Sequence, residues 1–77
     1  MHLYSTMLQI ENHPVAYRVS KEGGKFLLFT PLFPLDYPVD PPIFWVSKQD
    51  GVWKPIKLQD PTLIQQVVED IRQHQVK

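Results

Sequence analysis

The residues best suited to acid–base or metal chemistry are three histidines, and the chain keeps them far apart. They are His2, His13 and His74. No two of them have the spacing of zinc ligands, and the sequence contains no Cys to complete a site. His74 falls in the expected last turn of a helix, where the helix dipole favours a cation, so a structural role accounts for it. We predict no metal site and no cofactor.

Hydroxyl and carboxylate groups are present without the local pattern of a catalytic site. A nucleophile needs a base and an orienting group beside it. No elbow motif surrounds any of the hydroxyl residues considered, which are Ser5, Ser20, Ser47, Thr6, Thr30 and Thr62. Asp36 and Asp40 are expected to cap turns, and Glu69 and Asp70 to lie on a solvated helix face. Gly23-Gly24 is a turn and not a phosphate loop, because no helix follows it. We predict that the protein is not an enzyme.

The aromatic side chains are the residues most suited to binding. The sequence has four Phe, three Tyr and two Trp, and each such ring buries a large apolar area. The binding residues that we predict are Phe33, Tyr37, Phe44, Trp45 and Trp53. Lys48 is also expected to lie over Trp53 across a hairpin, a cation–π pair of ~0.5–1 kcal/mol at an exposed site.

These residues favour a non-enzymatic protein-interaction or accessory domain that uses an aromatic sheet face and a proline-rich loop. The alternative is a small-molecule or peptide binder with an aromatic groove between the loop and the hairpin. The partner is predicted to be another protein or a second copy of the chain.

Composition narrows the partners and the location. Of the 77 residues, 43% are hydrophobic, and eight basic residues balance eight acidic ones. Nucleic-acid binding is disfavoured because it draws most of its affinity from clustered Lys and Arg. No apolar run approaches the ~20 residues that span a bilayer, and the first residues do not resemble a signal peptide. We predict a cytoplasmic protein that does not bind membranes.

Hydrophobic periodicity predicts the elements that position these residues. Alternation with a period of two, or a short apolar run, predicts five strands, at 3–10, 15–20, 25–30, 43–47 and 52–58. Asp60-Pro61 is a typical helix start, and the apolar stripe that follows predicts a helix over 61–75. Pro14 is expected to end the first hairpin's ladder, and Pro55 to mark an edge strand. The whole chain, 1–77, is expected to form a single domain. We predict an α+β fold, an antiparallel sheet of about five strands in the order β-β-β-β-β-α, with one C-terminal amphipathic helix on one face.

Residues 31–42 contain five of the eight prolines and several large apolar side chains. Proline fixes φ and lacks a backbone donor, which excludes regular structure over most of this stretch. The apolar residues are too many for a solvated linker. We predict an ordered proline-rich loop packed onto the domain.

The hairpin at Asp50-Gly51 leaves the sheet with two apolar faces. A two-residue turn there places Ile43, Trp45, Ile56 and Leu58 on one face, and Phe44, Val46 and Trp53 on the other. One helix covers only one face. The other is covered by the proline-rich loop, by a second copy, or by a different partner, and we expect Trp53 and Phe44 to belong to this working surface.

Two local resemblances add to this interpretation. The segment Phe33-Pro34-Leu35-Asp36-Tyr37-Pro38-Val39-Asp40-Pro41-Pro42, preceded by Gly23-Gly24-Lys25-Phe26-Leu27-Leu28, resembles the strand and proline loop of ubiquitin-conjugating enzymes and RWD domains. The absence of Cys excludes thioester chemistry. We interpret the match as convergence on a packed loop, or at most as a non-catalytic relationship to these families. The second half, from Pro42 to Ile71, is similar to small stand-alone bacterial domains of unknown function, a resemblance that assigns neither an activity nor binding residues.

Overall fold

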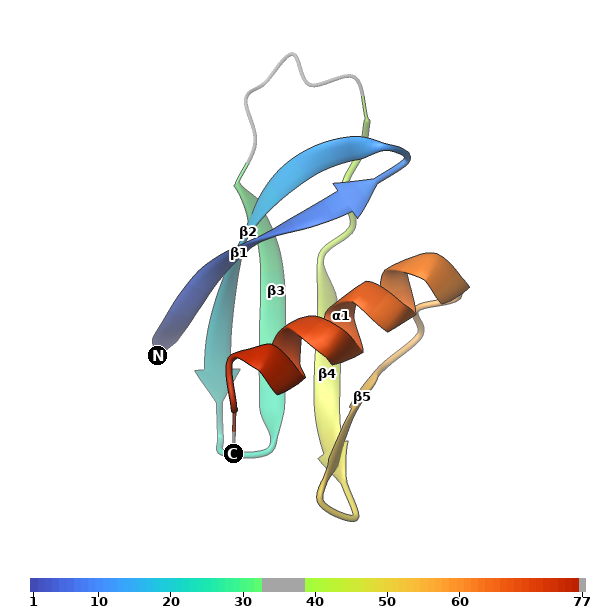
Figure 1. The fold of residues 1–77 in the computed structure, drawn as a ribbon. Helices are drawn as coiled ribbons and strands as arrows, with labels where there is room; N and C mark the ends of the chain where they lie inside the picture. The colour runs from blue at the N-terminus through green and yellow to red at the C-terminus, as the bar shows by residue number, and fades with distance from the viewer. Residues whose placement is uncertain (33–38, 77) are drawn as a thin grey trace.

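A computed structural model describes residues 1–32 and 39–76 of the chain (Figure 1). In this part the chain forms one antiparallel sheet with the strand order β1-β2-β3-β4-β5, followed by one helix. The elements are β1 (His2–Ile10), β2 (His13–Glu22), β3 (Phe26–Leu32), β4 (Phe44–Gln49), β5 (Val52–Pro55) and α1 (Pro61–Gln73). The predicted α+β fold and its element order are confirmed.

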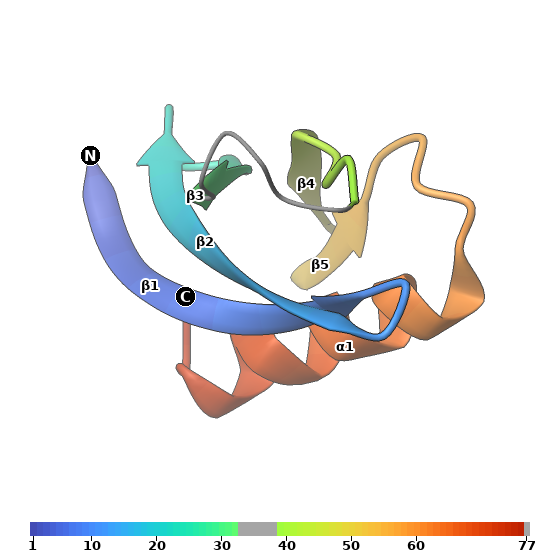
Figure 2. The same ribbon diagram turned by 90° about the horizontal axis from the view of Figure 1, so that it is seen from above.

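The sheet is curled, and α1 closes it between the two outer strands (Figure 1, Figure 2). The helix packs against β1 and β5. An edge strand leaves backbone groups unpaired, and covering it is one way to satisfy them. At β1 the Gln9 N–H donates to Gln66 Oε1 (2.8 Å), and Gln66 Nε2 donates to the Gln9 carbonyl (2.9 Å). The side-chain amide of Gln66 thus pairs with the edge as a neighbouring strand would.

The core fills the space between the concave side of the sheet and the helix. Every strand contributes alternate residues, and the helix contributes Leu63, Val67 and Ile71. At its centre Phe29 and Phe44 stack with their ring centroids 4.9 Å apart, and Tyr17 tilts against both. Aromatic packing of this kind adds ~0.5–1.5 kcal/mol per pair beyond the area that it buries.

The first hairpin follows the predicted alternation with one correction. Leu8 and Ile10 of β1 are buried, while Met7 is exposed. The turn residues Glu11 and Asn12 have φ values of 50° and 66°, so two residues are enough to reverse the chain. Pro14 does not end the ladder: it lies within β2 and pairs with Gln9. The backbone N–H and carbonyl of Gln9 bond to Gln66 of the helix and not to Pro14. The lack of an N–H on Pro14 therefore costs the sheet no hydrogen bond at this pair.

The ends of β3 and β5 also differ from the prediction. β3 continues through Pro31, which pairs with Tyr17, so the first two residues of the predicted loop belong to the sheet. β5 ends at Pro55, three residues early. Lys57 has a φ of 58°, which turns the chain from the sheet toward the helix. As a result Leu58 packs against the core and not, as predicted, on the face of Trp45.

The helix begins as its sequence predicts. The Asp60 side chain accepts hydrogen bonds from the backbone N–H groups of Thr62 (3.0 Å) and Leu63 (3.4 Å), and Pro61 occupies the first turn. The helix ends at Gln73 with His74 as its C-cap, two residues before the predicted end. The stripe is narrower than expected, because Val68 lies on the exposed side.

Candidate interaction surface

The convex side of the sheet, away from the helix, carries apolar side chains that nothing in the described residues covers. We define the open face by the outward residues of β2 to β5 and the residues next to them: Arg18, Ser20, Glu22, Phe26, Leu28, Thr30, Ile43, Trp45, Ser47, Lys54 and Ile56. Ser47 faces outward but is only 8% exposed. Ile43 is 65% exposed, Phe26 43% and Trp45 42%. Isolated exposed apolar residues are ordinary, whereas a contiguous group marks a surface for a partner.

The strand register places these residues in rows across the sheet. Leu28 of β3 pairs with Trp45 of β4, and the Ile56 N–H donates to the Trp45 carbonyl (2.9 Å). The next row toward the Asp50-Gly51 turn runs from Glu22 through Phe26 and Ser47 to Lys54. The open face therefore has an apolar centre on β3 and β4, with charged residues on the flanking strands.

An aromatic corner lies at the centre of the open face. The rings of Phe26 and Trp45 meet edge to face, with their centroids 6.1 Å apart at an angle of 86°. Together with Ile56 they line a shallow apolar hollow of about 360 Å³. Such a corner suits an apolar side chain or a proline ring, which the two perpendicular rings would contact on two sides.

The structure separates the predicted binding residues. Trp45 lies on the open face. Phe44 and Trp53 are only 5% and 8% exposed and belong to the core, so their expected place on the uncovered face is corrected. The helix covers their side of the hairpin because Leu63, Val67 and Ile71 need an apolar partner. Phe33 and Tyr37 lie outside the described residues, as does the whole of 33–38 in the proline-rich loop.

Sequence reasoning missed Phe26 and Ile56 as binding candidates although the signal was present. The hairpin pattern put Ile56 on the face of Trp45, and the two-sided apolar pattern of β3 required one of its sides to face outward. The pattern did not predict which side of the sheet the helix covers. Because the helix covers the concave side, Phe44 and Trp53 are buried, and Phe26 and Ile56 lie beside Trp45 on the open face.

Trp53 forms a second aromatic environment, on the helix side. The Lys48 ammonium lies 5.6 Å from the Trp53 ring centroid, which confirms the predicted cation–π pair. Trp53 Nε1 donates to the Val76 carbonyl (3.4 Å). These contacts, with the helix above the ring, make Trp53 a residue that attaches the C-terminal segment to β5.

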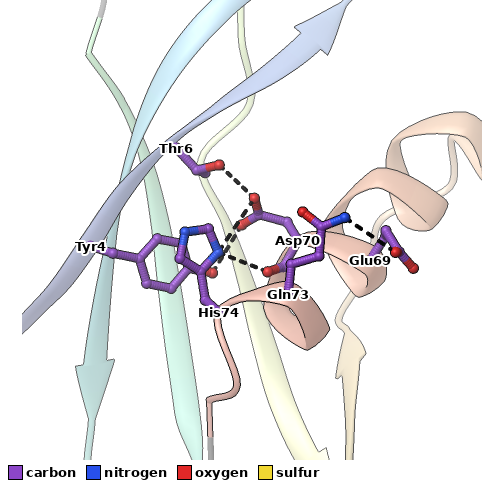
Figure 3. A network of polar contacts seen from close by, with 6 residues as sticks. All are labelled: Tyr4, Thr6, Glu69, Asp70, Gln73 and His74. Carbon is purple, nitrogen blue, oxygen red and sulfur yellow. Dashed lines mark hydrogen bonds and ion pairs between the residues drawn. The ribbon is translucent and has the colours of Figure 1, made fainter.

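A polar cluster joins the last turn of α1 to β1 (Figure 3). The hydroxyls of Tyr4 and Thr6 donate to the two carboxylate oxygens of Asp70, the former over 2.9 Å. The His74 ring stacks on the Tyr4 ring at 3.7 Å, and its Nδ1 lies 2.8 Å from the Asp70 carbonyl oxygen. The expectation that Asp70 faces solvent is wrong: it lies four residues before His74 and three after Val67, and so faces β1.

The chemistry available to this cluster is that of a structural tie. Burial and the neighbouring Asp70 carboxylate raise the pKa of Tyr4 well above its usual range, so its hydroxyl stays protonated and donates. Thr6 donates to the same carboxylate, whose Oδ1 also lies 3.7 Å from His74 Nδ1. Burial likewise raises the pKa of Tyr17, whose hydroxyl donates to the Pro42 carbonyl (2.7 Å).

The described residues contain no site of two other kinds. No three His, Asp or Glu side chains in residues 1–32 and 39–76 are grouped in a way that would hold a metal ion. Nor does the described part of the chain contain a helix with the length and apolar character required to cross a membrane.

Comparison of the chain with protein-family models, with curated proteins and with solved structures finds no match.

Proposed function

We propose that the protein is a non-enzymatic interaction domain that binds another protein surface through its open face. The observation that carries the proposal is the group of apolar side chains on β3, β4 and the end of β5, centred on Trp45 and left uncovered by the helix. Leaving these side chains in water costs free energy at ~25 cal/mol per Å² of apolar surface. A partner that buries them recovers that free energy. A cytoplasmic location remains a prediction from the sequence.

The proposal is tested by site-specific photo-crosslinking in the cells that produce the protein. A benzophenone amino acid replaces Trp45 in one variant and Val68 in a second. Val68 is the matched control because it is 41% exposed, close to the 42% of Trp45, but lies on the helix. We expect discrete crosslinked species from position 45 that are absent from position 68. The same products from both positions, or none from position 45, would contradict the proposal.

The aromatic corner supports a second candidate function, the binding of a proline-containing peptide or a small apolar ligand. Its specific support is the perpendicular arrangement of Phe26 and Trp45 around the apolar hollow. Titration with a polyproline peptide, followed by NMR, should shift the indole N–H resonance of Trp45 and leave that of Trp53 in place. Equal shifts of both indoles, or of neither, would reject this candidate.

A further inference from the structure

The charges on the flanks of the open face have opposite signs at opposite ends of one row. Glu22 lies on β2, and Lys54 lies on β5, with Phe26 and Ser47 between them. Three strand spacings of ~4.8 Å separate the two charged residues across the sheet. A surface with this pattern is complementary to a copy of itself turned through a half-turn.

The two-fold axis that brings opposite charges together is parallel to the strands and lies between β3 and β4. It places β2 of one copy opposite β5 of the other, and β3 opposite β4. Leu28 then meets Trp45 of the second copy, and Thr30 meets its Ile43. In the charged row Glu22 meets the second copy's Lys54, twice by symmetry. The apolar pair of Leu28 and Trp45 thus lies at the centre. In the charged row Phe26 meets the second copy's Ser47, and one ion pair lies at each end of the row.

The curvature of the sheet is compatible with this arrangement. β5 and the first part of β2 bend away from β3 and β4 toward the helix side, whereas the C-terminal end of β2 does not (Figure 2). Face to face, two such sheets approach most closely at β3 and β4, at the ~10 Å typical of packed sheets. The gap widens on the β5 side, where a long side chain such as that of Lys extends across it.

The existing contacts of the charged residues favour Lys54 over Arg18 as the partner of Glu22. Arg18 Nε already donates to His2 Nδ1 (3.2 Å). Lys54 is exposed and takes part in none of the ion pairs among the described residues. Glu22 lies 3.6 Å from the amino group of Met1, with both groups open to solvent. Its carboxylate therefore has acceptor positions left for a second cation.

We infer that the open face is the interface of a symmetric homodimer in which Glu22 of each copy pairs with Lys54 of the other. This inference rests on the proposed function and names its partner. It accounts for the uncovered apolar centre without any residue outside the described chain.

Sedimentation equilibrium of the full chain over a concentration series at low salt tests the inference. We expect the mass to rise from 9.0 kDa toward twice that value. Glu22→Lys and Lys54→Glu should each weaken the dimer about tenfold, because each breaks two exposed pairs and creates two repulsions. The double variant, with both charges exchanged, should recover the wild-type dissociation constant within about threefold. Trp45→Thr should abolish the dimer, and the control Val68→Thr should not.

Two results would overturn the inference. One is a monomer at every concentration, as expected if the proline-rich loop or a different protein covers the face. The other is a dimer that the double charge exchange fails to restore, which would mean another surface or another register. A monomer that still crosslinks to another protein through position 45 would refute the dimer and retain the proposed function. A dimer indifferent to Trp45→Thr, with no crosslink from position 45, would refute both.

Discussion

Replacing Asp70 by Asn should destabilise the protein through the polar cluster between α1 and β1. A hydrogen bond to a charged group contributes ~1.5–3 kcal/mol, against ~1 kcal/mol for a neutral pair. Asp70 accepts two such bonds, from Tyr4 and Thr6. Asn keeps the shape but loses the charge and can accept through only one of its two terminal atoms, so about 1 kcal/mol per bond is at stake. Part of it is screened because the cluster lies near the surface. We expect the free energy of unfolding to fall by about 1.5 kcal/mol.

Urea unfolding at 25 °C, followed by tryptophan fluorescence and by far-ultraviolet circular dichroism, measures this change. Glu69→Gln is the matched control: Glu69 is the adjacent carboxylate, exposed, and bonded to Arg72 and Gln73 on its own helix. The control should change the free energy of unfolding by no more than about 0.5 kcal/mol.

A double-mutant cycle separates the hydrogen bond from the general effect of the substitution. Tyr4→Phe removes one donor, and the pair Tyr4→Phe with Asp70→Asn should show a coupling of about 1 kcal/mol. If Asp70→Asn costs no more than Glu69→Gln, or if the cycle shows no coupling, Asp70 does not tie the helix to β1 as argued.

Three further substitutions test the core, the start of the helix and the contact of the helix with the edge of β1. Above pH ~10 the unfolded chain ionises its tyrosines while Tyr17 stays protonated in the fold, so stability falls as the pH rises. Tyr17→Phe should make that fall shallower by up to ~1.4 kcal/mol per pH unit, and a slope equal to the wild type's in urea titrations at pH 10–12 would contradict this. Asp60→Ala should cost ~1 kcal/mol through the lost N-cap, seen as a lower urea midpoint, and Asp60→Asn should restore most of it. Gln66→Ala should speed amide hydrogen exchange at Gln9 without changing exchange at Leu63, and unchanged protection at Gln9 would show that the helix does not cover this edge.

Local chemistry made several features of this fold predictable. Asp60-Pro61 and Asp50-Gly51 act through bonds and backbone angles that involve only nearby residues, and both occur where the sequence predicts them. The period-two pattern also assigned Trp45 and Ile56 to one face and Phe44 to the other, because alternation follows from strand geometry alone. Errors at the strand ends, as at Lys57, come from a single left-handed residue that the pattern does not reveal.

The choice of face depended on the tertiary structure. Both sides of β3 and β4 are apolar, so the sequence predicts a two-sided sheet with one helix and leaves open which side is covered. Only the curl of the sheet decides it: closing the gap between β1 and β5 places the helix on the concave side, over Trp53. The tie of Tyr4 and Thr6 to Asp70 spans more than sixty residues of chain, and no local pattern encodes such a contact. The alternation of side chains is a property of each strand, whereas the open face and its aromatic corner arise only when all five strands curl together.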